Sequence, residues 1–404
     1  MTVETAPTLT LSRAKEAVDA ARRLASVFAL RAAEHDRDAS VPVENFELLR
    51  EAGLLNLTVP AAHGGDGLGT EVLCRVLQEI ATGDPATALI LSMQYLARSG
   101  IGRSTRWPRD LYGRVTRETL DGVSLINAAR VEPELGTPSR GGLPATTATR
   151  TSTGWSLTGR KIYTTGAVVL SYAVVWAKTN EDPVRVGGFL VPMGSPGVSI
   201  EHTWNHLGMR ATGSDDLVLD EVSLPYEHAV DIRTQDEWRV ASGEAQALVQ
   251  GGLAIAAIYN GIAIAARNWL VSYLNERKPS NLGASLATLP RFQDAVGQIE
   301  TFLYINDRLI IGLAQAADKG ESVRPGEAGT VKTVVTENTI KVTSIGLELT
   351  GNPGLSRANP LERHYRDALC GRIHTPQADA VYVTAGKRAL GIGPGQPASV
   401  QARV

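Results

Sequence analysis

The 404-residue sequence has little of three things: cysteine, aromatic side chains and net charge. Its two cysteines, Cys74 and Cys370, cannot form a disulfide framework, and they offer no zinc-ligand spacing. Aromatic residues make up 5% of the chain, too few for a base-stacking platform. Forty basic and 42 acidic residues give a net charge of −2, without the basic excess of nucleic-acid binders. We expect no metal site, no nucleic-acid partner and a reducing, cytoplasmic location.

The sequence also lacks an N-terminal apolar run, so we expect no signal peptide. Residues 245–266 are uncharged and long enough to cross a membrane. Gln246, Gln250, Tyr259 and Asn260 interrupt this stretch, and glycines are frequent in it. We therefore expect a central helix that is buried on all sides, and no membrane partner.

What is present is a typical soluble composition, with 43% apolar and 20% charged residues, in a chain long enough for two or three domains. Helical periodicity dominates the first 120 residues and returns at 240–276, 290–318 and 327–350. Between them, threonine-rich alternating segments broken by glycine predict short strands of a small barrel or sandwich. The sequence predicts an α+β protein with a helical domain at 1–120, a β domain at 121–232 and a helical domain at 233–404.

Several motifs follow one another along the chain: Pro42 to Leu55; Val131-Glu132-Pro133-x-x-Gly136; Leu157-x-Gly159-x-Lys161-x-Tyr163-Thr164-Thr165-Gly166; Leu207 to Ser214; Glu276-Arg277; Gly351-x-x-Gly354; and Pro360 to Asp367. In this order they resemble the motifs of the acyl-CoA dehydrogenase superfamily. The resemblance covers roughly residues 15–390. It implies an N-terminal helical domain, a middle β-barrel domain and a C-terminal four-helix bundle, assembled as a homotetramer that binds a flavin (FAD, with FMN possible) and a small-molecule substrate.

Three consecutive residues suit the edge of a flavin ring. Tyr163, Thr164 and Thr165 can offer an aromatic face, hydroxyls and backbone groups, although a threonine-rich strand face is the alternative. The family usually has tryptophan where this chain has Tyr163. By resemblance, Val131 and Arg210 belong to the same cofactor site.

A second group of residues is implicated in the distal half of the cofactor. The family arginine that matches Arg277 holds the flavin pyrophosphate of a neighbouring subunit, whereas an ordinary arginine at a helix C-terminus is the alternative. Gly351 and Gly354 would let the backbone approach a ligand closely, or they form a plain turn.

The catalytic base of the acyl-CoA dehydrogenases is missing. The two positions where family members carry the glutamate are Thr375 and Gly251 in this sequence, and a threonine hydroxyl is too weak a base to replace it. His374 stands beside the first position. This segment resembles a branch of two-component flavin monooxygenases, including dibenzothiophene monooxygenases and amino-sugar nitrososynthases, which take reduced flavin from a separate reductase. A neutral imidazole could accept a substrate proton and an imidazolium could donate one, unless His374 only packs between helices.

The sequence alone does not decide which residues of the helix around residue 94 line the pocket, nor which reaction the protein catalyses. Gln94 and Tyr95 either line the substrate pocket or belong to the core. The leading hypothesis is a flavin-dependent oxidoreductase that oxygenates a small organic substrate. The alternatives are an acyl-thioester dehydrogenase with a displaced base, and a non-catalytic flavin or thioester binding protein.

Overall fold

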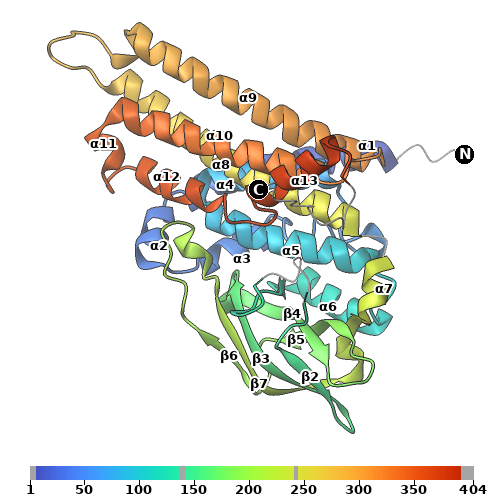
Figure 1. The fold of residues 1–404 in the computed structure, drawn as a ribbon. Helices are drawn as coiled ribbons and strands as arrows, with labels where there is room; N and C mark the ends of the chain where they lie inside the picture. The colour runs from blue at the N-terminus through green and yellow to red at the C-terminus, as the bar shows by residue number, and fades with distance from the viewer. Residues whose placement is uncertain (1–5, 137–141, 241–243, 393–404) are drawn as a thin grey trace, which may run out of the picture.

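The computed structural model describes residues 6–136, 142–240 and 244–392, and within them helices flank a single sheet. Figure 1 shows the helical bundle on one side of the molecule and the sheet on the other, with α5 between them. The helices are α1 Ala6–Phe28, α2 Ala32–Asp38, α3 Val43–Glu51, α4 Thr70–Gly83, α5 Pro85–Arg103, α6 Arg109–Asp121, α7 Gln235–Val240, α8 Glu244–Glu276, α9 Pro290–Asp318, α10 Glu327–Thr350, α11 Asn352–Leu355, α12 Leu361–Cys370 and α13 Ala378–Ala389.

The central helices of the N-terminal part begin at strong caps. Asp84 accepts hydrogen bonds from the backbone N–H groups of Ala86 and Thr87, both at 3.2 Å, and Pro85 occupies the first position of α5. The cap of α4 comes from the far end of α9, because Asp318 accepts from the backbone N–H of Thr70 at 2.7 Å. A cap supplied across 248 residues joins the first helices to the last ones.

The sheet has eight strands in the order β6-β7-β3-β2-β4-β5-β8, with β1 paired in parallel to β4. Alternate residues of these strands point inward and form a separate apolar core that includes Trp155, Val175 and Phe189. The strands are β1 Leu125–Ala129, β2 Thr147–Arg150, β3 Gly154–Thr164, β4 Leu170–Thr179, β5 Val186–Pro192, β6 Val198–Glu201, β7 Asp215–Pro225 and β8 Ala229–Arg233.

Helix α8 is the buried centre of the helical part. Every residue from 252 to 263 is buried, as expected of the uncharged stretch. The helix is long and apolar enough to cross a membrane, but 72% of its most apolar window is buried inside the protein. The predicted stretches 240–276, 290–318 and 327–350 correspond to α8, α9 and α10.

A chain of buried amides crosses the bundle. Asn260 of α8 donates to Gln78 of α4 at 2.9 Å, Asn306 of α9 donates to Asn260 at 3.0 Å, and Asn338 of α10 donates to Asn306 at 2.9 Å. Four helices therefore meet at this level, and one of them belongs to the N-terminal part of the chain. One apolar cluster contains buried residues of α1, α4, α5, α8 and α10. The helices before the sheet and those after it therefore share one core.

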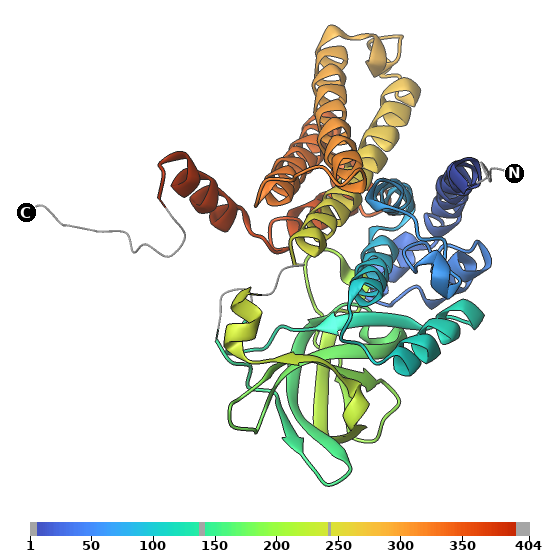
Figure 2. The same ribbon diagram turned by 90° about the vertical axis from the view of Figure 1, so that its right-hand side faces the viewer.

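The sheet contacts the bundle through the connection between β6 and β7. A side chain at Gly208 would meet the backbone of Arg366 at 2.3 Å, so only glycine allows this close approach to α12. In Figure 2 the sheet lies below the helical bundle, and α13 projects from the rest of the molecule.

Candidate flavin and substrate site

The end of β3 forms an aromatic ledge. Tyr163 has a left-handed backbone (φ 59°), and its side chain is 53% exposed. Its ring meets the rings of Trp204 and His206 edge-on, with centroids 6.2 and 6.0 Å away, and those two rings stack on each other. A large exposed aromatic face that is held by two other rings offers a flat surface to a ligand.

The residues after Tyr163 supply polar groups beside this ledge. The Thr165 hydroxyl lies 3.1 Å from that of Ser214, and the Thr165 carbonyl accepts from the Asn127 side chain at 3.0 Å. The Thr164 hydroxyl is buried and has no hydrogen-bond partner within the described protein. Asn127 and Ser214 were missed from the sequence, although a lone asparagine in the apolar strand LINAA was a usable signal.

A buried ion pair lies behind the ledge. Lys161 and Glu132 are 0% and 1% exposed, and Nζ lies 2.5 Å from the carboxylate. Burial alone would raise the pKa of Glu132, but hydrogen bonds from Lys161 and Thr146 lower it overall. Next to the pair, the Val131 carbonyl accepts from the Ile162 N–H at 2.9 Å, which fixes the strand end assigned to the flavin side.

His374 lies in the turn between α12 and α13. It is partly buried, and its Nε2 lies 3.0 Å from the hydroxyl of the fully buried Tyr259. Burial, and to a lesser degree the charge of Lys332, lowers the pKa of His374 to about 4. The imidazole is therefore neutral at pH 7, which fits an orienting role as a hydrogen-bond acceptor, whereas the low pKa disfavours both proton acceptance and an imidazolium donor. Thr375 is exposed.

The second base position faces open space. No heavy atom outside its own helix and chain neighbours lies within 4 Å of a side chain built at Gly251, whereas one at Gly252 would meet Ala328 at 3.1 Å. The neighbouring Gln250 points away, toward the hydroxyl of Ser99 at 2.9 Å. A substrate could therefore approach α8 at Gly251.

Two residues proposed for the pocket lie in the core instead. Gln94 and Tyr95 are both fully buried. Gln94 accepts from the backbone N–H of Ile126 at 2.8 Å, and Tyr95 donates to the backbone carbonyl of Leu54 at 2.5 Å. Both side chains bind neighbouring backbone groups, so they position α5 against β1 and the N-terminal segment.

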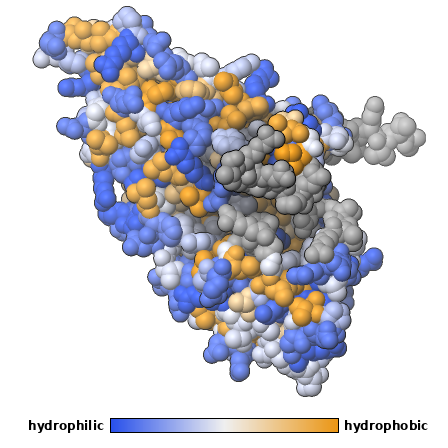
Figure 3. All heavy atoms as spheres, in the orientation of Figure 1, coloured by the Kyte–Doolittle hydropathy of each residue, from blue (hydrophilic) through white to orange (hydrophobic). Residues whose placement is uncertain are grey.

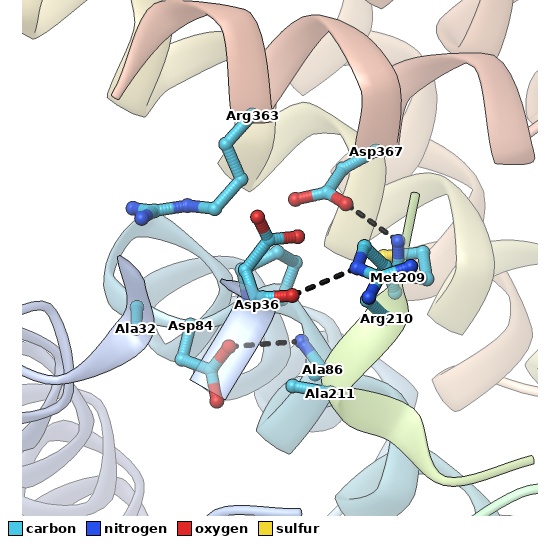
Figure 4. Close-up of a pocket in the computed structure, with 10 residues that line it drawn as sticks. Ala32, Asp36, Asp84, Ala86, Met209, Arg210, Ala211, Arg363 and Asp367 are labelled. Carbon is cyan, nitrogen blue, oxygen red and sulfur yellow. Dashed lines mark hydrogen bonds between the residues drawn. The ribbon is translucent and has the colours of Figure 1, made fainter. Parts of the chain in front are cut away.

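Arg210 lies at a junction of three parts of the chain. Its Nε donates to the backbone carbonyl of Asp36 at 2.8 Å. The small pocket shown in Figure 4 is lined here by α2, the start of α5, residues 209–211 and α12. Burial raises the pKa of Asp367 to about 7, although its carboxylate accepts from the Met209 N–H at 2.6 Å. The pocket lies where these parts of the chain meet, and residues of neither the aromatic ledge nor the His374 turn line it.

Arg277, Gly351 and Gly354 lie toward the opposite end of the bundle. At about 1.5 Å per helical residue, Arg277 lies roughly 27 Å from Tyr259 along the line of α8. Gly351 ends α10 with a φ of 61°, and Gly354 is buried in α11. The structure therefore divides the predicted cofactor residues into three groups: the end of β3, the junction at Arg210 and this end of the bundle.

The residues of the ledge fit a flavin ring. They provide an exposed aromatic face, two hydroxyls that share one hydrogen bond, and the buried Thr164 hydroxyl without a protein partner. These groups match the mixed polar and apolar edge of an isoalloxazine.

The comparisons with known proteins agree with this geometry. Family models match in three stretches: "Acyl-CoA dehydrogenase, N-terminal domain" at 12–103, "middle domain" at 129–222 and "C-terminal domain" at 238–375. The acyl-CoA dehydrogenase-type protein YdbM of Bacillus subtilis is 35% identical over 89% of this chain and 92% of its own. The amino sugar nitrososynthase DnmZ of Streptomyces peucetius is 27% identical over 85% of both chains.

A solved structure shows the same fold with a flavin. KijD3, in complex with FMN and a dTDP-linked amino-keto sugar, is 26% identical, with a TM-score of 0.80 over 98% of this chain and 96% of its own. FAD or FMN accordingly fits as the cofactor. From the three matched domains, the chain belongs to the acyl-CoA dehydrogenase family of flavin-dependent oxidoreductases.

Proposed function

We propose that this protein oxygenates a small organic substrate with O₂ and reduced flavin delivered by a separate reductase. The observation that supports this proposal is that neither of the two base positions, Thr375 and Gly251, is a carboxylate. The neutral imidazole of His374 lies next to the first of them in the chain. When bound, the flavin supplies the two electrons that activate O₂. One oxygen atom then enters the substrate and the other leaves as water.

The chain's own residues orient the reactants. Tyr163 would provide a face for the flavin ring, and the Thr165 hydroxyl would hold its polar edge. In the tautomer whose Nε2–H donates to the Tyr259 hydroxyl, Nδ1 of His374 is left to accept a hydrogen bond from a substrate N–H, S–H or phenol. The relatedness to nitrososynthases, which by name act on an amino sugar, supports a polar substrate.

Rapid mixing separates this function from its alternatives. The photoreduced, flavin-loaded protein is mixed with O₂ and candidate amines, thiols or phenols, and both product and H₂O₂ are measured. Oxygenated product at the expense of H₂O₂ supports the proposal. Reduction of the oxidised flavin by an acyl-thioester would instead indicate a dehydrogenase. The absence of both reactions would indicate a binding protein.

The second candidate function is an acyl-thioester dehydrogenase, and the similarity to YdbM favours it. It requires a base from another place in the structure, because Thr375 is a hydroxyl and Gly251 has no side chain. General-base catalysis commonly contributes about 10²- to 10⁴-fold, so this reading predicts slow turnover with ordinary acyl-CoA.

We propose a homotetrameric assembly in the cytoplasm. Apolar side chains on α9 and α13 are exposed, including Tyr304 (63%), Tyr382 (61%) and Leu390 (76%). Figure 3 shows apolar residues scattered among polar ones over the helical side. Closed symmetric assembly would cover such residues and could bring Arg277 to a neighbour's cofactor. Sedimentation of a stable, flavin-loaded monomer would contradict this assembly.

A further inference from the structure

Lys332 is a buried charge that the sequence motifs did not single out. It lies on α10 and is 1% exposed. Its ammonium donates to the carbonyl of His374 at 2.8 Å and to that of Pro376 at 3.4 Å. These two carbonyls flank Thr375, the position where the family carries its carboxylate.

No carboxylate within the described residues forms an ion pair with this ammonium. Glu337, one turn further along α10, is held by Arg372 at 2.7 Å. Burial lowers the pKa of Lys332 to about 8, so most molecules carry the charge at pH 7. A buried charge is costly, and a methionine of similar length would usually pack at least as well. Both hydrogen bonds of the ammonium reach one turn of the chain, which points to that turn as the reason for the charge.

Besides Lys332, the turn is anchored to α10 by Arg372, whose guanidinium pairs with Glu337 at 2.7 Å. Residues 371–377 form neither helix nor strand and include the exposed Thr375. The side chain of His374 is held by Tyr259 of α8, and its backbone is held by Lys332 of α10. Together the two contacts fix both ends of the histidine, so the imidazole keeps one orientation only while both are made.

Resting on the oxygenation proposed above, we propose that Lys332 is a positioning residue that holds the turn 373–377 and so aims the His374 imidazole at the substrate. Lys332 does not touch the reacting atoms. Its removal should leave flavin binding intact but free the turn, so that His374 samples solvent and O₂ is diverted to H₂O₂.

The test compares Lys332→Met with Lys332→Arg, and with Lys341→Met as the matched control on the exposed side of the same helix. The first readout is the rate at which diethyl pyrocarbonate modifies His374, measured by peptide mass spectrometry on the flavin-loaded protein. Hydrogen bonds from a charged donor are strong enough that this rate should rise at least ~10-fold in Lys332→Met. Lys332→Arg should restore most of the protection, and Lys341→Met should match the wild type.

The second readout is the ratio of oxygenated product to H₂O₂, which should fall at least ~10-fold in Lys332→Met. If wild type forms no product but His374 modification still rises only in Lys332→Met, the positioning role stands and the oxygenation proposal fails. If Lys332→Met does not fold, Lys332→Gln, which is shorter and neutral, replaces it. Unchanged His374 modification in a folded, neutral variant would overturn the positioning role.

Discussion

The aromatic ledge and the turn 371–377, which our proposal brings together in one site, are built in opposite ways. The ledge lies at the end of β3, which pairs with β7 as far as Thr164 with a shift of register after Lys161, and it is backed by the buried Lys161–Glu132 pair. The turn lacks regular structure, and side chains from α8 and α10 hold it. The half that fits the flavin is therefore held by strand pairing and by a buried ion pair. The other half, the turn in which this chain lacks the family's catalytic glutamate, is held by a few side-chain contacts. Small sequence changes can therefore alter its chemistry.

The largest effect should come from His374→Ala in the turn. We expect flavin affinity to be retained and product formation to fall by about 10²-fold or more, with O₂ diverted to H₂O₂, because the imidazole orients the substrate. Product and H₂O₂ are measured under the same O₂ supply. Thr375→Val, next to it, should change the rate far less, and an equal loss in both variants would show that the turn acts only through its shape.

Behind the ledge, the substitution to compare with His374→Ala is Lys161→Met. It leaves the Glu132 carboxylate buried without its cation, so the free energy of unfolding should fall by about 3–5 kcal/mol. Urea denaturation followed by circular dichroism checks this. Arg324→Met breaks an exposed pair with Glu327 that water screens, and it should cost far less. Similar losses in the two variants would contradict the difference in burial.

The pH dependence of stability tests the turn by itself. The pKa of His374 is lowered to about 4, so between about pH 6.5 and 4 the unfolded chain binds a proton that the folded protein does not. His374 therefore stabilises the fold above pH 6.5, and this contribution is lost as the pH falls through the window. Asp367, with a pKa raised to about 7, acts in the opposite direction. The measurement is thus the difference in unfolding free energy between wild type and His374→Gln, which should shrink or reverse in favour of the variant toward pH 4.

A smaller effect is expected from Thr165→Ala at the ledge. Removing one neutral hydrogen bond should weaken flavin binding by about 1 kcal/mol, or shift the flavin reduction potential. Equilibrium titration and spectroelectrochemistry measure the two quantities. Ser214→Ala removes the partner hydroxyl and is the matched variant. Unchanged affinity, potential and turnover in Thr165→Ala would place the flavin edge elsewhere.

The smallest effect is a gain. Gly251→Ala should raise the free energy of unfolding by about 0.5–1 kcal/mol, because alanine favours the interior of a helix and the new methyl group meets no heavy atom within 4 Å. Gly252→Ala should gain less or lose stability, because its methyl group would press on Ala328 at 3.1 Å. Thermal unfolding of both variants checks the open space proposed for substrate.

The sequence predicted the long helices well, because α8, α9 and α10 have strong periodicity and end near glycine, proline or polar connections. It also placed Tyr163 and Thr165 at a strand end. It could not decide the positions of Gln94 and Tyr95, since an apolar helix does not reveal which face meets a cavity. Lys332 was missed because a lysine in a helix usually faces solvent, and only the tertiary structure places it under the His374 turn.

The cap that Asp318 provides to α4 also bears on how the chain is synthesised. Thr70 leaves the ribosome 248 residues before Asp318, a delay of roughly 12–50 s at about 5–20 residues per second. Until Asp318 is made, the start of α4 lacks its carboxylate, and until Asn260 is made, Gln78 lacks its amide partner, whereas the strands of the sheet have all their strand partners once Arg233 is made. The sheet, although it is encoded second, is therefore the first part able to complete its own contacts. The first helices complete theirs only when α8 and α9 arrive.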